Sequence, residues 1–550
     1  MSVHFQAINT DFTMDQTSPP EYAYNDDDDG DSDLDSQSGC ENGSPPRRRL
    51  CAQSTRWNGI DDLDTAPKLQ KFTPKRKPGH QLDPNGTYTP LDLFSLFVDY
   101  GAISILCNNI NKQAVKSIDK GKKYNWIPVQ ETDIYKFLGL TFYFCLVKLP
   151  EIKDYWKQNT IFSQVFPPKV MARERYRTIY WNIDMSDSYD DPSNDKKKGM
   201  PQCDPLLSLR PLLDIITSAC KMYYHPQRSL SIEKKMVATK AHIKVKATNK
   251  EFQLFVLSDS DNGYTVDFSI YAGTSQLSSN HGLQYDTVMS LLNPSYLGHG
   301  YHLYVDNFYT SPRLFKDLYD MNIGACGLFK GNRKDCPQTQ NNALTKKEPR
   351  GTIRWIREGP LVFVKWMDSR EVSICSTFHP AFAGETTMQH SKHNDGNWGS
   401  TAVTCPTPVI EYNKHMKCFD FSEHLIQYHT IHQKTSNWYR TLFFHFLDIS
   451  ATNAYLLHKE LCRERKQNPM THRGFVQELT AQLCGVTVSI PPSKAPEQHL
   501  PVPVSNQTEK SKRASYGRKG CIYCRNTLRK EQSTPWKCHL SCFFPYNFNQ

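Results

Sequence analysis

Residues 301–311, Tyr-His-Leu-Tyr-Val-Asp-Asn-Phe-Tyr-Thr-Ser, decide how this chain is expected to fold. The run from Tyr301 to Val305 is apolar and aromatic, which predicts a buried strand. Asp306 closes that run, and a carboxylate at the carboxyl end of a core strand stands where α/β sheets place their functional sites. The segment therefore predicts an α/β core with Asp306 at the edge of the sheet where functional sites lie.

The sequence around this segment shows strand patterns in the middle of the chain and helical patterns on either side. Further strands are predicted at 229–232, 252–257, 264–271, 323–329, 351–355 and 361–366, and a helix at 312–320. Turn residues at 259–263 separate two of the strands, so a β-meander is expected. Strands that come first and then alternate with a helix indicate a mixed α/β core. Helical periodicity dominates from 88 to 224 and from 420 to 457.

Charge is distributed unevenly along the chain. No Lys or Arg precedes Arg47, while the same stretch holds 11 Asp and Glu residues. Without that stretch the remaining chain has 66 basic and 45 acidic residues, a net charge of +21. A basic body indicates a polyanionic partner, and an acidic tail can shield the same surface or simply aid solubility.

Composition argues against a membrane or a disulfide-rich secreted protein. The longest clean apolar run, near 137–147, stops at Lys148 and is shorter than the ~20 residues that cross a bilayer. We expect no secretory signal, because no basic segment followed by an apolar stretch opens the chain. The 17 scattered cysteines then fit free thiols and one metal site better than a disulfide framework.

Three further carboxylates are candidates to act with Asp306. Glu233 ends the predicted strand at 229–232, and Asp420 and Glu423 start a predicted helix three residues apart, so they share one face. Such carboxylates, brought together, can hold two Mg²⁺ ions that activate water and stabilise a leaving 3′-oxygen. Spacing alone leaves the alternative open that Asp420 caps its helix and that Glu233 is a surface charge.

Several phrases in the chain resemble the piggyBac transposase family, from about residue 85 to the C-terminus. The central ones are the 301–311 segment itself, Ser-Leu-Ser-Ile-Glu at 229–233 with Lys240, and Tyr-Asn-Lys-His-Met at 412–416. The others are Tyr155-Trp156, Gly263-Tyr264, Lys365-Trp366 ahead of Ser376-Thr377, Trp438, and Asn453-Ala454-Tyr455. Their combination is specific to this family.

This resemblance implies an RNase H-like catalytic core that is split by an insertion domain. It also implies a helical domain for dimerisation and DNA binding, and a cysteine-rich C-terminal module that binds terminal repeats. Together with the composition, the resemblance predicts the domain boundaries. The helical domain takes residues 85–228 and 424–485, the core takes 229–330 and 406–423, and the insertion takes 331–405. A disordered acidic region at 1–84 precedes them, and a basic linker at 486–520 and the cysteine-rich module at 521–550 follow.

The family cuts and pastes DNA at TTAA sites with Asp residues and a divalent metal. The resemblance places its three Asp positions on Glu233, Asp306 and Asp420, with a further one on Glu423. Glu233 is longer than Asp by one methylene, about 1.5 Å, whereas catalytic geometry tolerates about 0.5 Å.

The neighbours of these positions also depart from the family. Lys234-Lys235 replace an acidic and a small residue, and Lys417-Cys418 replace a glycine pair. The connection between Lys246 and Phe252 is several residues short.

The C-terminal module also departs from the family pattern. The Cys positions present are Cys521, Cys524, Cys538 and Cys542, whereas an intervening Cys pair is missing and Asn547 replaces the closing His. Four cysteines can form at most one tetrahedral Zn²⁺ site, and four reduced thiols are the alternative. Basic residues upstream, at 510–519, fit a nuclear signal, phosphate contacts or a solvated linker.

Two functions of different class follow. The sequence favours a nuclear, transposase-derived protein that binds double-stranded DNA as a homodimer and is impaired in catalysis, because the departures fall at functional positions while the strand and helix patterns remain. The alternative is an active transposase that uses Glu233, Asp306 and Asp420. A scaffold without any DNA role is a third possibility. We expect no membrane and no small-molecule substrate as partners.

Overall fold

The computed structural model describes most of the chain between Arg56 and Val486 and two short strands beyond. Within 56–486 the residues it leaves out are 70, 124, 159–160, 162, 186–195, 197–205, 239–250, 272–280, 332, 334, 393–397, 429 and 432–437. Beyond that, it describes 519–520 and 533–534. The chain divides into a compact unit up to Gly485 and a second unit from Val486 onward.

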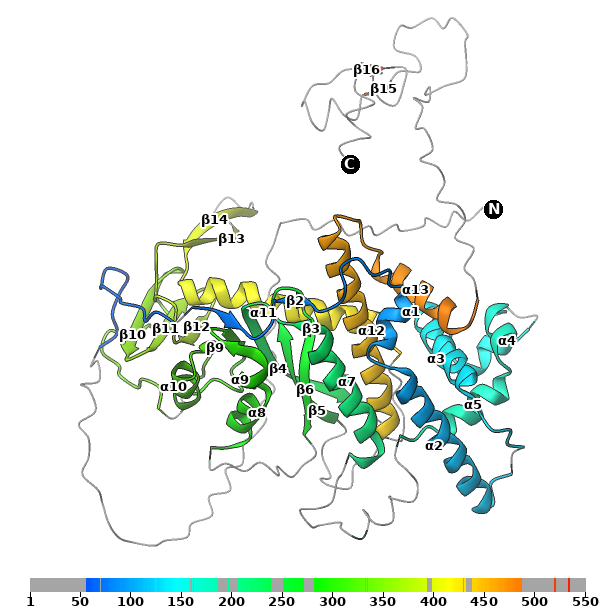
Figure 1. The fold of residues 1–550 in the computed structure, drawn as a ribbon. Coiled ribbons are helices and arrows are strands. Elements are labelled where there is room, and N and C mark those ends of the chain that lie inside the picture. The colour runs from blue at the N-terminus through cyan, green and yellow to red at the C-terminus, as the bar shows by residue number, and fades with distance from the viewer. Residues whose placement is uncertain are drawn as a thin grey trace, which may run out of the picture. The chain divides into compact units, whose positions relative to one another are not determined.

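An eight-stranded mixed sheet forms the centre of the first unit (Figure 1), in the order β10-β11-β12-β9-β8-β4-β5-β6. Its strands are β4 (Ser229–Ala238), β5 (Glu251–Asp259), β6 (Thr265–Tyr271), β8 (His302–Val305), β9 (Gly324–Leu328), β10 (Ile353–Glu358), β11 (Leu361–Met367) and β12 (Glu371–Ser376). The predicted α/β core and the β4–β5–β6 meander are confirmed, because β4, β8 and β9 pair in parallel and the other neighbours are antiparallel.

The parallel centre of the sheet has helices on both faces. Alternate residues of β8 enter two different cores. Leu303 belongs to the same core cluster as Leu314 of α10 (Pro312–Asp320), and Tyr304 belongs to the same core cluster as Tyr412 of α11 (Thr407–Tyr428). The side chain of Ser311 accepts the Leu314 N–H and caps α10. The period of two in the strand thus separates the two helix layers.

The predicted insertion at 331–405 is joined to the core by strand pairing. β12 pairs with β9 through Ile374–Leu328, Cys375–Gly327 and Ser376–Cys326, so β10, β11 and β12 continue the central sheet. β13 (Thr386–Lys392) and β14 (Trp398–Thr404) form a separate two-stranded ribbon. The insertion therefore shares its main sheet with the core.

Helices from both sides of the core sequence pack together in the first unit. They are α1 (Pro90–Ser95), α2 (Tyr100–Asp119), α3 (Glu131–Leu146), α4 (Phe166–Val170), α5 (Arg173–Trp181), α7 (Arg210–Tyr223), α12 (Trp438–Glu464) and α13 (His472–Leu483). α1 packs on α12 and α13, and α3 packs on α13. A Cβ at Gly139 would lie 2.5 Å from the Cys484 Sγ, so this glycine permits the close approach of α3 and α13. Tyr155 and Trp156 lie in the 3-10 helix η1 (Ile152–Trp156).

The expectation of disorder over 1–84 is wrong from Arg56 onward. We call residues 56–86, apart from 70, the N-terminal strap; Figure 1 shows this blue segment crossing from β10 to α1. Trp57 is 1% exposed and its Nε1 donates to the Thr339 carbonyl at 3.0 Å, while Asn58 forms a bridge with Trp355. Asp64 accepts from Arg357 Nη2 at 2.7 Å. Tertiary contacts hold the strap, which a reading of local periodicity cannot detect.

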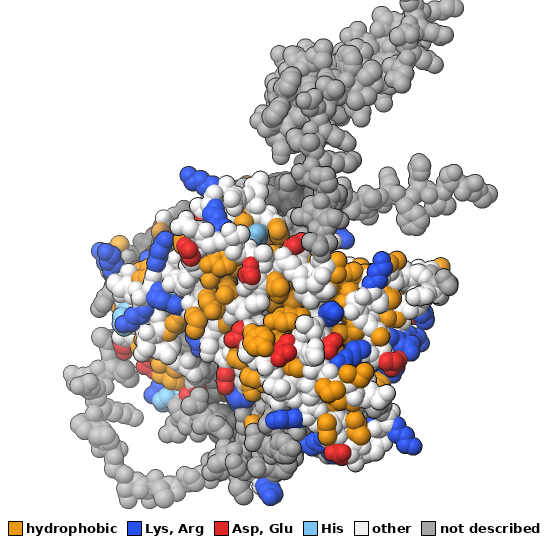
Figure 2. Space-filling model, turned by 45° about the vertical axis from the view of Figure 1, so that its right-hand side comes forward, with side chains coloured by type: hydrophobic (Ala, Val, Ile, Leu, Met, Phe, Trp, Pro, Cys, Tyr) orange, Lys and Arg blue, Asp and Glu red, His pale blue; other side chains and the backbone are white. Residues whose placement is uncertain are grey.

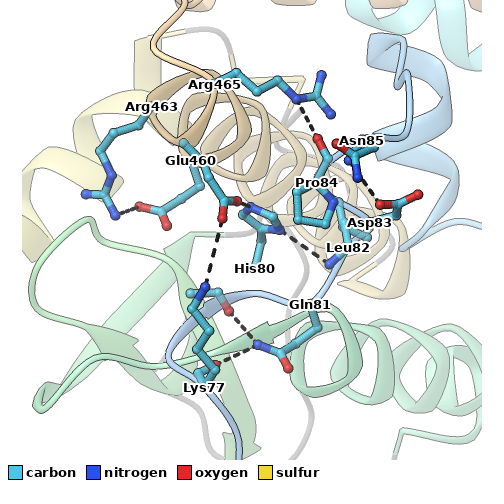
Figure 3. Close-up of polar contacts among 12 residues, drawn as sticks. Lys77, His80, Gln81, Leu82, Asp83, Pro84, Asn85, Glu460, Arg463 and Arg465 are labelled. Atoms are coloured by element: carbon cyan, nitrogen blue, oxygen red, sulfur yellow. Dashed lines mark hydrogen bonds and ion pairs between the residues drawn. The ribbon is translucent and has the colours of Figure 1, made fainter.

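The middle and end of the strap contact the core and then α12. β1 (Thr73–Pro74) pairs with β7 (Gly298–His299), which follows α9 (Pro294–Leu297), and β2 (Gly79–His80) pairs with β3 (Tyr224–His225). Arg76 donates to the Met222 and Tyr224 carbonyls at the end of α7, at 2.9 and 3.0 Å. Figure 3 shows the contacts with α12, where Arg465 Nε donates to the Pro84 carbonyl at 2.9 Å.

Other predicted features fall outside the described residues. These are the tail at 1–55, most of the linker at 486–520, and Cys521, Cys524, Cys538 and Cys542; the second unit contributes the pairing of β15 (Lys519–Gly520) with β16 (Ser533–Thr534). The nine cysteines described are buried and unpaired. No helix among the described residues is both long and apolar enough to cross a membrane.

Candidate active site

Glu233 lies on β4, and Asp306 directly follows the neighbouring strand β8. β4 and β8 pair in parallel with Ile232 opposite Val305, and the two carboxylates follow these partners. Paired residues of neighbouring strands point to the same face, and strands lie ~4.8 Å apart. Ser231, two residues before Glu233, pairs with Tyr304, two residues before Asp306. Because side chains alternate between the two faces of a strand, Glu233 lies on the same face of the sheet as Tyr304, which is the face that α11 covers.

A local turn holds Asp306 in place. Its Oδ1 accepts the N–H of Phe308 at 2.9 Å and of Tyr309 at 3.4 Å, and Thr310 Oγ1 donates to the Asp306 carbonyl at 2.9 Å. Burial raises the pKa of Asp306 above its ordinary value, although these N–H groups act in the opposite direction. The backbone thus occupies one carboxylate oxygen before any ligand is bound.

The Tyr309 ring packs against Phe255 and Phe308 at the turn that follows β8. Its side chain is 1% exposed, and burial together with the charges of Asp306 and Glu233 raises the pKa of its hydroxyl. Within the described part of the chain this hydroxyl has no hydrogen-bond partner. The charges of both carboxylates therefore act on this buried hydroxyl, and carboxylate oxygens are ligands that suit a hard cation.

Asp420 and Glu423 lie within α11, not at its start. The helix begins at Thr407, so both the expected helix start at Asp420 and the alternative of a helix cap are wrong. Met416 and Tyr412 pack on the cluster that faces the sheet, and position 420 continues their stripe four and eight residues on. The side chains of Asp420 and Glu423 lie outside the described structure, and the convergence of the three carboxylates stays a prediction.

The helix α11 is seated on the strands that carry the other two carboxylates. It packs against β4, β8, β9 and β12. The His415 ring stacks on Tyr304 with the ring centroids 4.6 Å apart. Among side chains that the structure describes, no three His, Cys, Asp or Glu residues are placed to hold one metal ion.

Comparison with known proteins identifies the family. A family model described as "Transposase IS4" matches residues 89–455, more than half of the chain. Human PiggyBac transposable element-derived protein 3 is 23% identical over 440 residues, which cover 76% of this chain and 68% of the relative. Human PiggyBac transposable element-derived protein 2 is 22% identical, over 70% of this chain and 64% of its own length.

The chain belongs to the piggyBac transposase family. A solved structure, a cryo-EM structure of the piggyBac transposase synaptic complex with hairpin DNA, matches with a TM-score of 0.62 at 19% identity. The match covers 83% of this chain and 95% of that one. It supports an α/β transposase fold for the chain.

Two cations accompany Asp306 in this piggyBac family member. The positive charges of Lys234 and Arg333 both lower the pKa of Asp306, although burial outweighs them. Lys234 Nζ lies 4.8 Å from the centre of the Phe308 ring, on the face of β4 opposite to Glu233 by strand alternation. Arg333 Nη2 donates to the Phe308 carbonyl at 3.0 Å, and its Nη1 donates to the Thr310 carbonyl.

Sequence reasoning found Lys234 but missed two members of this site. Tyr309 stands three residues after Asp306 and was a readable neighbour. Arg333 stands 27 residues after Asp306, and no sequence pattern links the two. The fold brings Arg333 to the turn after β8 through its bonds to backbone carbonyls.

Proposed function

We propose that this piggyBac family protein binds double-stranded DNA and is impaired in strand cleavage. DNA binding is supported by family membership, by the net charge of +21 on the chain that follows the acidic tail, and by the similar fold of the piggyBac transposase in its synaptic complex with hairpin DNA. On the face drawn in Figure 2, basic and acidic side chains are interspersed among hydrophobic ones. On this face, the proposed DNA contacts are therefore separate basic side chains and not one large basic patch.

The single observation that carries the loss of cleavage is the placement of Lys234 and Arg333 at the turn that holds Asp306. Lys234 Nζ lies 4.8 Å from the centre of the Phe308 ring, and Arg333 Nη2 donates to the Phe308 carbonyl at 3.0 Å. A carboxylate that holds a divalent cation works by its negative charge, and fixed positive charges nearby oppose that binding. The side chain of Glu233 is longer than that of Asp by about 1.5 Å, whereas the position of a catalytic group tolerates an error of about 0.5 Å. Both effects weaken the same pair of ligands.

Glu233, Asp306 and Asp420 are the residues that would hold Mg²⁺ in an RNase H-like core. Transposases of this type generally use a divalent metal, which when bound stabilises charge on the oxygens of the scissile phosphodiester. Asp306 offers the oxygen that its turn leaves open, and Glu233 offers its carboxylate from the adjacent strand.

The alternative is an active transposase that cuts and pastes at TTAA sites, and an excision assay separates the two. We expect excision by the unmodified chain to be undetectable or very weak. Glu233→Asp alone should not restore it, because Lys417 and Cys418 also replace a family glycine pair beside Asp420. The assay therefore includes Glu233→Asp combined with Lys417→Gly and Cys418→Gly. Robust excision by the unmodified chain, abolished by Asp306→Ala, would establish the active transposase instead.

The remaining parts of the proposal concern partners and location. We propose a homodimer assembled through the helical region, a nuclear location, and one Zn²⁺ bound by Cys521, Cys524, Cys538 and Cys542. Light scattering of the full chain tests the dimer and imaging of a tagged chain tests the location. Metal analysis of the chain against a Cys521→Ser/Cys524→Ser variant tests the zinc. A monomer, a cytoplasmic signal, or no loss of zinc in the variant would each contradict the corresponding part.

A further inference from the structure

A pocket of about 530 Å³ opens between η1 and α5, in the helical region. Aromatic rings from α5 line it: Tyr176, Tyr180 and Trp181. Three cations line it as well: Lys153 from η1, and Arg173 and Arg177 from α5. Its volume lies within the ~300–1,000 Å³ typical of sites for small ligands.

One ring of this pocket is presented to solvent. Trp181 is 42% exposed, whereas Tyr176 is 1% exposed and its hydroxyl lies 3.1 Å from Thr141 Oγ1. Arg177 lies over the Trp181 ring, 4.5 Å from its centre. A large indole with a guanidinium on it is therefore held at the opening, and Tyr176 forms a rigid floor.

The position of Trp181 is fixed by a helix from the other end of the chain. Arg440 of α12 donates to the Trp181 carbonyl and lies 5.4 Å from the centre of the Tyr180 ring. It adds a fourth cation beside the pocket. The end of α5 is thus anchored, so a ligand would find the ring preorganised.

Within the described part of the chain, the cations of the pocket pair with two carboxylates, and one of these, Glu151, itself lines the pocket. Glu174 pairs with Arg173 at 2.8 Å and with Arg177 at 3.0 Å, and Glu151 pairs with Lys153 at 2.5 Å. Side chains in these pairs are 41–59% exposed, and pairs of this kind contribute about 0–1 kcal/mol.

We propose that this pocket binds one unstacked nucleotide of single-stranded DNA. A planar base stacks on the Trp181 ring, and the phosphates on either side contact Arg173, Arg177 and Lys153. A ligand that combines a flat ring with negative charge matches an aromatic floor under a cationic rim, the arrangement by which single strands are bound without sequence preference. Bases in a duplex cover each other's faces, so a duplex cannot offer its ring faces to Trp181.

This inference goes beyond duplex binding and does not depend on whether the protein cuts DNA. Its test is a titration of the full chain with a labelled oligothymidylate at low salt, because thymidylate strands stack little on themselves. A second probe of equal length carries abasic positions and keeps every phosphate. The unmodified chain should bind the first probe more tightly than the second.

Removal of the ring should abolish that preference. We expect Trp181→Ala to weaken oligothymidylate binding about 5- to 150-fold, the range for loss of one stacked base, and to leave abasic binding unchanged. Trp181→Phe should recover most of the loss. The matched control is Tyr100→Ala on α2, an aromatic residue that is 65% exposed and lies outside the pocket, and it should bind as the unmodified chain does.

The outcomes are distinguishable from failure of duplex binding. Equal binding of both probes by the unmodified chain would overturn the inference, as would a Trp181→Ala chain that keeps its preference for bases. An equal loss in Tyr100→Ala would do the same. Loss of duplex binding alone, with the base preference intact, would instead contradict the proposed function.

Discussion

The N-terminal strap should be released by a single methyl group at Gly298. This glycine of β7 has φ +97° and ψ −144°, and an added Cβ would lie 2.3 Å from the Thr73 carbonyl oxygen of the strap. The Lys75 N and Pro74 C atoms would lie at 3.1 and 3.2 Å. Because all three contacts are with backbone, Gly298→Ala requires the strap itself to move.

Gly384→Ala is the matched control for this change. Gly384 has φ +96° but no atom within 4 Å of an added Cβ. Both substitutions cost about 1–3 kcal/mol of backbone strain. Only Gly298→Ala also loses the β1–β7 pairing and the bond from Lys75 N–H to the Leu297 carbonyl at 3.0 Å. At a central value of about 1 kcal/mol per hydrogen bond, the loss of two or three bonds adds about 2–3 kcal/mol.

Hydrogen exchange measures this difference locally, which suits a chain too large for two-state unfolding. An added 2–3 kcal/mol corresponds to roughly 30- to 150-fold faster exchange at the Lys75 amide in Gly298→Ala than in Gly384→Ala. The Gln81 amide, bonded to the Tyr223 carbonyl at 2.9 Å, reports whether release spreads along the strap. Equal exchange in the two variants would refute the assignment of the strap as a packed element.

Two further predictions concern charge. Duplex DNA affinity should fall steeply between about 50 and 200 mM salt as counterion release weakens, and binding that is absent at low salt or indifferent to salt would contradict the DNA-binding proposal. Burial holds the pKa of His379 at about 3, so stability from its neutral form is fully present above about pH 6.5 and is lost as the pH falls toward 3. For this side chain, 7% exposed, the loss between pH 7 and 5 is about 2 kcal/mol. His379→Asn should therefore flatten the fall of the thermal unfolding temperature over that range, and an unchanged slope would show that His379 is not held neutral.

The sequence by itself determined the elements whose periodicity is local. The run 301–305 predicted β8, the turn at 259–263 predicted the hairpin of β5 and β6, and the helix predicted at 312–320 has the bounds of α10. Each of these segments carries its pattern within a few residues: alternation or an apolar run for strands, and a Ser-Pro start for the helix. The phrases at 229–233 and 301–311 also indicated the family, and the comparisons confirm it.

Only the tertiary structure decided which distant residues meet. The register of β4 against β8 puts Glu233 beside Asp306, and Arg333 reaches the same turn through backbone carbonyls. Trp57 is buried against residues more than 280 positions away, although its own segment is polar and lacks periodicity. Strand pairing and the burial of an isolated residue such as Trp57 depend on partners far away in the chain. The local sequence therefore carries no repeating pattern that would reveal these contacts.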